Sequence, residues 1–519
     1  MTSPEKKWTA IFNAERSAVL TAMVAAAFVL GVVIFWHGFG PRDEGHYVRA
    51  AFRWLEEGPY LGDTHWALRH LFVMPIAGSF AVFGPSVFSA TLPNIVFAGG
   101  LIALTWFFGR RYLGLVEAFV ASVLIAFSPF FMARPIELDV YGAEVFFIAL
   151  AVWLFVAAQF ERRVLALLFA AGLCAGFAWS LREVSVSSII GLGALALVFH
   201  RKRFWQASLA LGAGFALVPA LELILYSVAA GDPFYRYRID LGHTGASISS
   251  QPKGPPPSAF DWFILPFKDM ATYPMTAPFV VLAILTAVAF RGEIRAMALS
   301  ARRTMLNFLV VSAFALPVSA WVLHLAMPHY YPIVAYTAYL TFGVGVALAA
   351  RRFGPWAGGL LALLVLATNF AAEDFRNYDD YAEPEYLASQ INDFDEPVYT
   401  DFITAKRAKM LLRLRGGDAN DLDAKIVGVA TPPTGGLFFE AHPRPLPPIN
   451  PAWCRIDARQ VRAFSWTHAL IRAMGGADVQ VARLGAVVAE HEPVAFYRVT
   501  DTAVHVDPVT GATCERAAP

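Results

Sequence analysis

The apolar run AVLTAMVAAAFVLGVVIFW (residues 18–36) and the polar stretch RDEGHYVRAA (residues 42–51) that follows it decide the fold class. The run contains no charged side chain and is close to the length of about 20 largely apolar residues that a membrane-spanning helix needs. We therefore predict a transmembrane helix that ends shortly before Asp43 and Glu44. The role of two adjacent carboxylates at a membrane surface depends on the side that they face, and hence on the topology.

The composition of the 519-residue chain is that of a membrane protein. Hydrophobic residues make up 57% and charged residues 16% of the sequence, whereas a soluble domain carries about 25% charged residues. One globular core cannot hide so many apolar side chains, so most of them are expected to face lipid. The net charge of +1 gives no basis for a nucleic-acid surface. The sequence also lacks zinc-ligand spacing and phosphate-binding glycine-rich motifs.

Eleven stretches of the sequence are predicted as transmembrane helices. They cover residues 18–36, 87–108, 113–133, 142–160, 164–181, 184–199, 204–230, 271–290, 304–325, 330–350 and 353–372. A twelfth apolar stretch, residues 70–86, is shorter and is interrupted by proline and glycine. Whether this stretch crosses the membrane determines the orientation of everything after it.

The short basic loops decide this question. They lie at residues 110–111, 162–163, 201–203, 291–303 and 351–352. Cytoplasmic loops carry an excess of Lys and Arg, and all of these loops are cytoplasmic only if residues 70–86 do not cross. We therefore expect an interfacial or re-entrant segment at 70–86, a cytoplasmic N-terminus and an external C-terminal part. The transmembrane domain is residues 1–372, with a first outer loop at 37–86 and a long outer loop at 231–270.

The C-terminal part, residues 373–519, is polar and is predicted to be a soluble α/β domain. The apolar runs PVYT, KIVGV, GLFF and VAFYRV read as strands, and residues 402–414 and 465–474 as helices. Cys454 and Cys514 both lie here. An oxidising exterior would let them pair, although the sequence alone does not establish the geometry that a disulfide requires.

The outer connections of this topology carry ionisable residues or histidine. They contain Asp43, Glu44 and His46, then His65, Arg69 and His70, then Arg134, Glu137 and Asp139, then Arg182 and Glu183, then Asp240 and His243, and finally His329 with Tyr330 and Tyr331. Ionisable residues at this depth usually mark a functional site. Carboxylates can deprotonate a hydroxyl or bind a divalent cation, and the planar donor fork of arginine suits phosphate. The set predicts transfer of a group from a lipid-linked phosphate on the outer face.

Five segments resemble, in this order and topology, the membrane-embedded GT-C glycosyltransferases. They are RDEGHYVRAA (42–51), MPIAGSFAVFGPSVFSATLP (74–93), SPFFMARPIELD (128–139), SLRE (180–183) and HYYPIV (329–334). The resemblance is to the family 39-like branch, which includes protein mannosyltransferases and the lipid A aminoarabinose transferase. It implies a GT-C fold and inverting transfer from a polyprenyl-phosphate-linked sugar to a lipid, glycan or protein acceptor. It also implies a site on the periplasmic side of a bacterial inner membrane.

The resemblance further implies roles for individual residues. Asp43 is similar to the acid of the first outer loop that acts as the base, Glu44 to its neighbour and Asp139 to the acid of the second outer loop. Arg182 stands where many members have a basic residue facing the donor phosphate. The residues expected at the donor phosphate are Arg182, Arg134, Arg69, Tyr330, Tyr331 and His329.

The sequence departs from the family pattern at the metal site. In the aminoarabinose transferase an acidic metal ligand precedes the segment that is similar to MPIAG, but this chain has Val73 and Met74 at that place. His70 and His243 are candidate replacements as ligands of a divalent metal ion. The use of a metal ion is therefore left open.

Purely structural roles also fit several of these residues. Asp43 is a favourable N-cap for a helix that begins at Glu44. The same sequence allows ion pairs between Arg134 and Asp139 and between Arg182 and Glu183, an interfacial anchor at 329–331, and hydrogen-bonded scaffold roles for His70 and His243.

Two further classes of function compete with an enzyme. A transporter or flippase is expected to carry polar residues within its spans, whereas here the span interiors are almost free of charge. A non-catalytic assembly protein would bind its partner through the C-terminal domain. The clustering of acids and arginines on one face favours the glycosyltransferase.

Overall fold

The computed structural model describes the chain apart from residues 1–3, 41–42, 241, 243–257, 259, 261–262, 265–266, 269–276, 323–329, 377–380, 442–452, 460, 462–464, 474–493 and 500–519. The chain folds as two compact units. The helical unit comprises Met1–Trp36, Ala50–Ala77 and Thr91–Ala372, and the sheet unit comprises His37–Arg49, Gly78–Ala90 and Glu373–Pro519.

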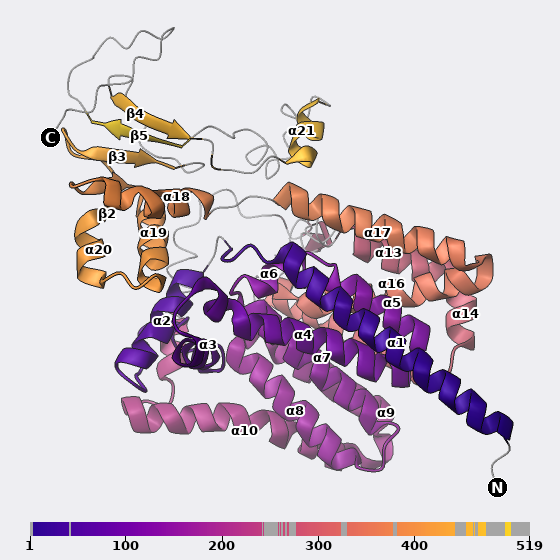
Figure 1. Cartoon of the computed structure of the whole chain (residues 1–519). Coiled ribbons are helices and arrows are strands. Elements are labelled where there is room, and N and C mark those ends of the chain that lie inside the picture. The colour runs from indigo at the N-terminus through magenta and orange to yellow at the C-terminus, as the bar shows by residue number, and fades with distance from the viewer. Residues whose placement is uncertain are drawn as a thin grey trace. The chain divides into compact units, whose positions relative to one another are not determined.

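Helices dominate the chain before residue 377 (Figure 1). In chain order they are α1 (Pro4–Phe35), α2 (Glu44–Glu56), α3 (His70–Phe83), α4 (Val87–Tyr112), α5 (Leu115–Ala126), α6 (Ala133–Ile136), α7 (Val140–Ala158), α8 (Val164–Leu181), η1 (Glu183–Ser185), α9 (Val186–Phe199), η2 (Arg201–Arg203), α10 (Phe204–Ala230), α13 (Ala277–Ala289), α14 (Arg291–Ala296), α15 (Leu299–Pro317), the π-helix η3 (Val318–Val322), α16 (Pro332–Phe353) and α17 (Pro355–Arg376). Residues 235–240 form a further helical segment after α10.

Eight helices in the described part of the chain are long and apolar enough to cross a membrane. They are Glu15–Phe35, Val87–Tyr112, Val140–Ala158, Val164–Leu181, Arg201–Ala230, Leu299–Val322, Pro332–Phe353 and Pro355–Asp374. The remaining three predicted spans correspond to the shorter apolar helices Leu115–Ala126, Glu183–Phe199 and Val280–Ala289, and His70–Phe83 is also short. The polytopic helical architecture is therefore confirmed, and the total of eleven spans stays a prediction.

The predicted span at 113–133 is wrong in its extent, because α5 ends at Ala126. A helix of 12 residues rises about 18 Å, which is less than the hydrocarbon thickness of about 30 Å. Pro129 explains this end. Proline has no amide hydrogen for the helix ladder and disfavours a helical conformation at the preceding residue. The chain turns after Phe127 and then forms the short α6.

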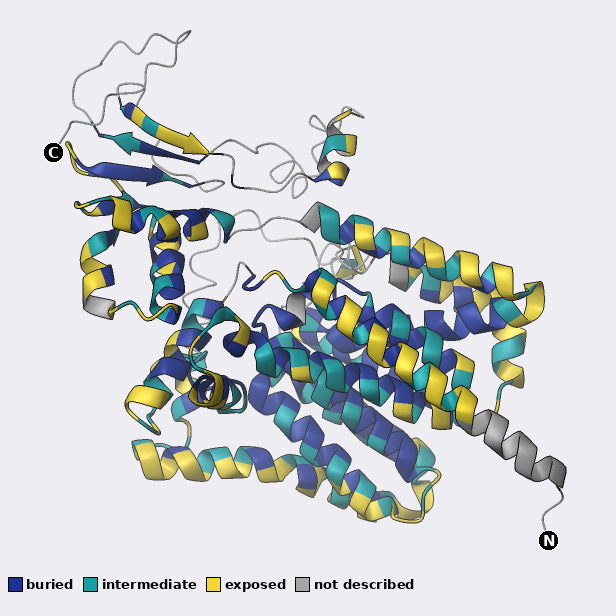
Figure 2. Ribbon diagram, viewed as in Figure 1, coloured by how far each residue is buried: buried dark blue, intermediate teal, exposed yellow. Residues whose placement is uncertain are grey.

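The helical unit has an inner and an outer set of helices. Most residues of α7 and α16 are buried, whereas exposed residues run along α1 and α10 (Figure 2). The exposed positions of α10 include Leu209, Leu221 and Val228. An outward apolar surface on a long helix is what contact with lipid requires.

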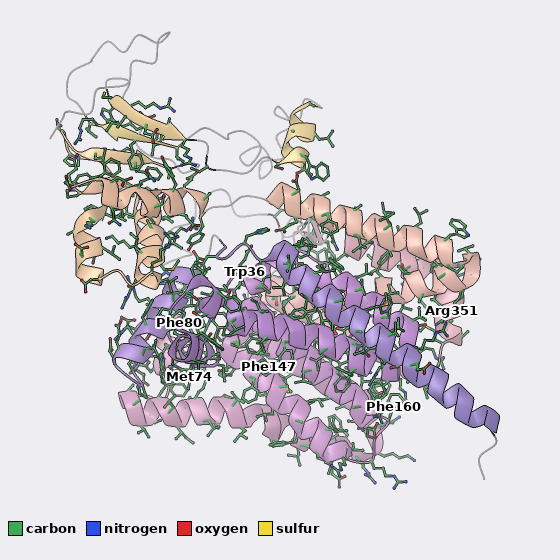
Figure 3. All side chains as sticks on the ribbon, in the orientation of Figure 1. Trp36, Met74, Phe80, Phe147, Phe160 and Arg351 are labelled. Carbon is green, nitrogen blue, oxygen red and sulfur yellow. The ribbon has the colours of Figure 1, made fainter. Side chains whose placement is uncertain are left out.

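Several buried polar groups in this unit find partners on neighbouring elements. The Tyr336 hydroxyl lies 2.7 Å from Thr105 Oγ1 and accepts a hydrogen bond of 3.1 Å from Trp153 Nε1. Trp36, which Figure 3 labels, donates from Nε1 to Thr91 Oγ1 over 3.0 Å. Such bonds offset the cost of burying polar atoms.

Helices α8 and α10 pack closely along a seam of glycines. A Cβ atom at Gly172 would collide with the carbonyl oxygen of Leu211, and one at Gly214 would collide with that of Phe169. Gly172 and Gly176 are four residues apart, the spacing that lets helix backbones approach each other in membranes. The seam holds the middle of α8 in close contact with α10.

The sheet unit contains a five-stranded sheet with the strand order β2-β1-β3-β5-β4. Its elements after residue 381 are α18 (Ala382–Gln390), η5 (Ile391–Asp393), β1 (Val398–Thr400), α19 (Phe402–Leu414), α20 (Ala419–Lys425), β2 (Ile426–Gly428), β3 (Leu437–Glu440), β4 (Cys454–Arg459), α21 (Trp466–Ala473) and β5 (Val494–Arg498). Strand β1 runs parallel to β2 and β3, and β5 runs antiparallel to β3 and β4. The predicted C-terminal α/β domain is thus present.

The cysteines of the sheet unit were predicted only as a possible pair. Cys454 takes part in a disulfide, and Cys514 lies outside the described residues. Cys174 of the helical unit is free and buried.

Candidate functional site

Arg182 forms a buried ion pair at the end of α8. Its side chain has only 5% of its surface exposed, and its Nη1 donates to Glu144 Oε2 of α7 over 2.7 Å. Glu144 is completely buried and also accepts a hydrogen bond of 2.6 Å from Ser185 Oγ. The proposed pairing of Arg182 with Glu183 is therefore wrong, because the chain turns after α8 and points the two side chains to different partners.

Two tyrosine rings lie close to the Arg182 guanidinium. Its Cζ lies 4.3 Å from the ring centroid of Tyr141 and 4.5 Å from that of Tyr330. A guanidinium group on an aromatic face is held by cation–π attraction. Tyr331, the second predicted tyrosine, is instead part of the hydrophobic core of the helical unit.

Arg236 is the centre of a second buried cluster. It lies on the helical segment that follows α10, with 1% of its side chain exposed. Its Nη1 lies 3.0 Å from Glu222 Oε1, its Nε lies 3.4 Å from Asp240 Oδ2, and its Nη2 donates to Glu183. The hydroxyl of Ser180 donates to Glu222 as well. This cluster joins the end of α8 to α10.

Arg69 connects the two clusters electrostatically. Its positive charge acts on Glu144 of the first cluster and on Glu183 and Asp240 of the second. Together the clusters contain three guanidinium groups and four carboxyl groups (Arg69, Arg182 and Arg236 with Glu144, Glu183, Glu222 and Asp240). With one carboxyl group protonated, these charges balance.

Asp240 is a carboxyl group of these clusters whose pKa lies near neutral pH. Burial is the largest cause that raises the pKa of Asp240 to about 7, and the negative charge of Glu183 and a hydrogen bond with it act in the same direction, against Arg236 and Arg69. A group that titrates near neutral pH within a cluster of fixed charges is typical of functional sites.

His70 does not lie in a metal-binding arrangement. Its ring packs 5.8 Å from the Trp54 centroid and 6.2 Å from that of Tyr226, and its buried Nδ1 has no partner among the described residues. Burial, followed by the charge of Arg236, lowers the pKa of His70 to about 4, so the ring is neutral.

The second predicted metal ligand, His243, lies outside the described residues. Among the residues that the structure describes, no three His, Cys, Asp or Glu side chains form a group that could hold a metal ion. The metal site proposed at His70 and His243 therefore stays a prediction.

Asp139 has a structural role at the start of α7. It is the N-cap residue, and its Oδ1 accepts a hydrogen bond of 3.3 Å from the backbone amide of Tyr141. Its carbonyl oxygen accepts a hydrogen bond of 2.9 Å from Asn94 Nδ2. Arg134 lies in α6, but its side chain lies outside the described residues, as does all of His329.

Asp43 and Glu44 belong to the sheet unit and differ sharply in exposure. Asp43 is exposed, and its carbonyl oxygen accepts the amide of His46 over 2.9 Å at the start of α2. No hydrogen bond or ion pair to the Asp43 carboxylate occurs within the described residues. The side-chain cap that the sequence allowed at Asp43 is therefore not formed there.

Glu44 is buried against the C-terminal part of the chain. It has 2% of its surface exposed, accepts a hydrogen bond from the Tyr381 hydroxyl and lies 3.7 Å from Arg407 Nε of α19. The guanidinium of Arg407 also lies 5.1 Å from the Tyr381 ring centroid. Glu44 thus holds the beginning of α2 in place beside α19.

Replacing Tyr381 with phenylalanine is expected to destabilise this attachment. The change removes a hydrogen-bond donor from a buried carboxylate, which costs about 1–3 kcal/mol. Thermal unfolding of the detergent-solubilised protein measures the loss. Tyr399→Phe in β1 is the matched control, and an equal effect of both changes would contradict the role of the Glu44 bond.

Sequence reasoning missed Glu144 and Arg236. A signal for Glu144 was present, because a carboxylate in the apolar run VYGAEVFF is rare in a membrane helix. Arg236 follows the predicted span 204–230 in the sequence YRYRID, and nothing in its spacing distinguishes it from a loop residue. The structure also gives Glu222, to which no role was assigned, a place in the Arg236 cluster.

Comparisons with known proteins agree with this architecture. Residues 71–226 match the family described as dolichyl-phosphate-mannose-protein mannosyltransferases. A comparison with curated protein sequences found no match. The crystal structure of apo ArnT from Cupriavidus metallidurans is similar with a TM-score of 0.53 at 12% identity, covering 96% of this chain and 99% of that chain. ArnT from the same organism bound to undecaprenyl phosphate gives a TM-score of 0.53 at 13% identity, covering 93% and 98% of the two chains.

The oligosaccharyltransferase of Archaeoglobus fulgidus is a larger protein. It aligns with a TM-score of 0.47 at 13% identity over 76% of this chain, and this chain spans 61% of its length. The likeness to ArnT extends over nearly the full length of both proteins. The chain therefore has the GT-C fold of membrane glycosyltransferases, as its sequence resemblance predicted.

Proposed function

We propose that the protein is an inverting membrane glycosyltransferase that moves a sugar from a polyprenyl-phosphate-linked donor to an acceptor hydroxyl outside the cytoplasm. The acceptor is a lipid, a glycan or a protein, and the proposed location is a bacterial inner membrane with the site on the periplasmic side. The GT-C fold, the family match at 71–226 and the undecaprenyl phosphate bound by ArnT support this proposal.

The oriented guanidinium of Arg182 is the observation that carries the proposal. In an inverting transfer the acceptor oxygen attacks the anomeric carbon, and the bond from that carbon to the phosphate oxygen breaks. The electron pair leaves with the phosphate, so negative charge develops there. A preorganised cation stabilises such charge most effectively, and we assign this task to Arg182 with Arg69.

Asp43 is proposed as the base that takes the proton of the acceptor hydroxyl. The assignment rests on the resemblance of the first outer loop to that of GT-C enzymes, and the exposed carboxylate of Asp43 is compatible with it. Glu44 is proposed as a positioning residue, because its bonds to Tyr381 and Arg407 hold the start of α2. Asp139 is proposed to act through the capping of α7.

The proposal is tested with the purified protein in liposomes. Candidate undecaprenyl-phosphate sugars are supplied with cell-envelope extract as acceptor, and release of undecaprenyl phosphate is measured. Release that depends on both donor and acceptor is expected. Movement of the donor across the bilayer without release would identify a flippase instead and overturn the proposal.

The pH dependence of undecaprenyl phosphate binding should show whether Asp240 takes up a proton when the phosphate binds. A bound anion favours the protonated form of this group, so undecaprenyl phosphate is expected to bind more tightly at pH 6 than at pH 8. A one-unit rise in the pKa of Asp240 on binding corresponds to up to about tenfold in affinity. Isothermal titration calorimetry measures both the affinity and the proton uptake.

Asp240→Asn provides the critical comparison for that experiment. Asparagine stays neutral, so between pH 6 and pH 8 the affinity of the variant should change only with the ionisation of the phosphate itself, whereas the native protein should lose additional affinity at pH 8. Asp232→Asn is the control, because Asp232 lies in the same connection after α10 but pairs with exposed Arg238. The second ionisation of the phosphate, at a pH of about 6, affects binding to all three proteins equally. An unchanged pH dependence in Asp240→Asn would rule out this role.

A further inference from the structure

We propose that α21 is an interfacial helix that lays its apolar face into the lipid headgroup region beside the end of α17. The helix has eight residues, Trp466–Ala473. Trp466 and Leu470 are each 50% exposed, and Ala473 is exposed as well. Positions separated by four and three residues lie on one face of a helix, so these side chains form one exposed apolar stripe.

The N-terminal turn of α21 is attached to the chain. Thr467 is buried with 8% exposure, and Ser465, just before the helix, with 1%. The exposed stripe is therefore not a consequence of an unattached helix. It is the exposed face of a helix whose first turn already has a partner.

Asp374 is that partner, and it sets the depth of α21. Its Oδ2 accepts hydrogen bonds of 2.8 Å from the Thr467 amide, 2.5 Å from Thr467 Oγ1 and 2.9 Å from Ser465 Oγ. A carboxylate at a helix N-terminus is also favoured by the helix dipole. Three bonds to one side chain fix the first turn of α21 at Asp374.

The length of α17 places Asp374 near the proposed membrane boundary. It is the last residue of the 20-residue apolar segment Pro355–Asp374. Twenty helical residues rise about 30 Å, the hydrocarbon thickness of a bilayer. The first turn of α21 is therefore held where the hydrocarbon gives way to the headgroups.

An apolar stripe at this depth fits lipid better than water. Tryptophan is enriched at the membrane–water boundary, where its amphipathic ring is stable. Amphipathic helices of this kind bury their apolar face about 5–10 Å into the boundary. The helix that carries Asp374 has the exposed leucines of a lipid-facing span, Leu360, Leu363 and Leu364.

A spin label tests the proposal in the full-length protein. Leu470→Cys in a Cys174→Ser background is labelled with a nitroxide and placed in phosphatidylglycerol-containing nanodiscs with one chain per disc. Asn392→Cys, at an exposed polar position of the same unit, is the matched control. At position 470 the nitroxide should collide more often with oxygen, which is enriched in lipid, than with a water-soluble nickel complex. At position 392 the nitroxide should collide more often with the nickel complex.

Two outcomes would overturn the proposal. Equal access of the nickel complex to both positions would place the stripe in water. Shielding of position 470 from both reagents would show a protein partner instead of lipid. Ala473→Cys repeats the measurement at a second position if the label at 470 disturbs the helix. Asp374→Ala removes the attachment of the first turn, and it should increase access of the nickel complex to position 470 at least severalfold.

Discussion

Replacing Asp43 with asparagine is expected to abolish sugar transfer while leaving donor binding intact. Asparagine has the same shape but cannot accept the proton of the acceptor hydroxyl at neutral pH. Loss of a general base typically lowers the rate by about 10²- to 10⁴-fold. Single-turnover transfer from a labelled donor measures the rate, and equilibrium binding of undecaprenyl phosphate measures donor affinity.

Asp63→Asn is the matched control for Asp43. Asp63 is another acid of the first outer loop, with 75% of its side chain exposed and its Oδ1 3.8 Å from Arg53 Nη1. Transfer by this variant should match that of the native protein. Native rates in Asp43→Asn would remove Asp43 from the base role, and equal losses in both variants would indicate a general effect of charge in the loop.

Arg182→Lys is expected to lower kcat/KM for transfer by about 10- to 100-fold. This loss corresponds to the free energy of one charge-assisted hydrogen bond to the phosphate. Lysine keeps a charge that can pair with Glu144. It lacks the planar group that lies between Tyr141 and Tyr330 and the fork of donors that matches a phosphate. The effect should appear in kcat/KM for transfer and in the affinity for undecaprenyl phosphate.

Lysine is preferred to alanine here because Arg182→Ala leaves Glu144 buried without its cation, at a cost of about 3–5 kcal/mol in stability. Arg351→Lys is the control. Arg351, labelled in Figure 3, lies in the last turn of α16 and pairs with buried Glu117. Native activity is expected in the control, and equal losses in both variants would mean that Arg182 acts only through stability.

The sequence predicted the sheet unit well where its pattern reflects burial. Four strands and two helices were located from apolar runs and periodicity, but β4 was not. This strand lies at the edge of the sheet, and only its first residue, Cys454, is buried. An edge strand with polar residues on both faces carries no alternating pattern, and its position is set by pairing with β5.

The sequence identified several residues of the buried charged clusters but not how they pair. The predicted outer connections were identified from their charges. The charges of Arg69 and Arg182 both act on Glu144. Pairing depends on how helices pack. The side chain of Arg182 selects Glu144, which is 38 residues away, over its neighbour in the sequence. No local pattern contains that information.

The glycine seam between α8 and α10 has a kinetic consequence. Backbones in direct contact cannot slide or separate without losing their packing, so we expect these two helices to move together through each catalytic cycle. For the proposed isoprenoid-linked donor, loading and release of the carrier would then require displacement of other helices. The speed of turnover would be limited by those helices and not by the α8–α10 pair.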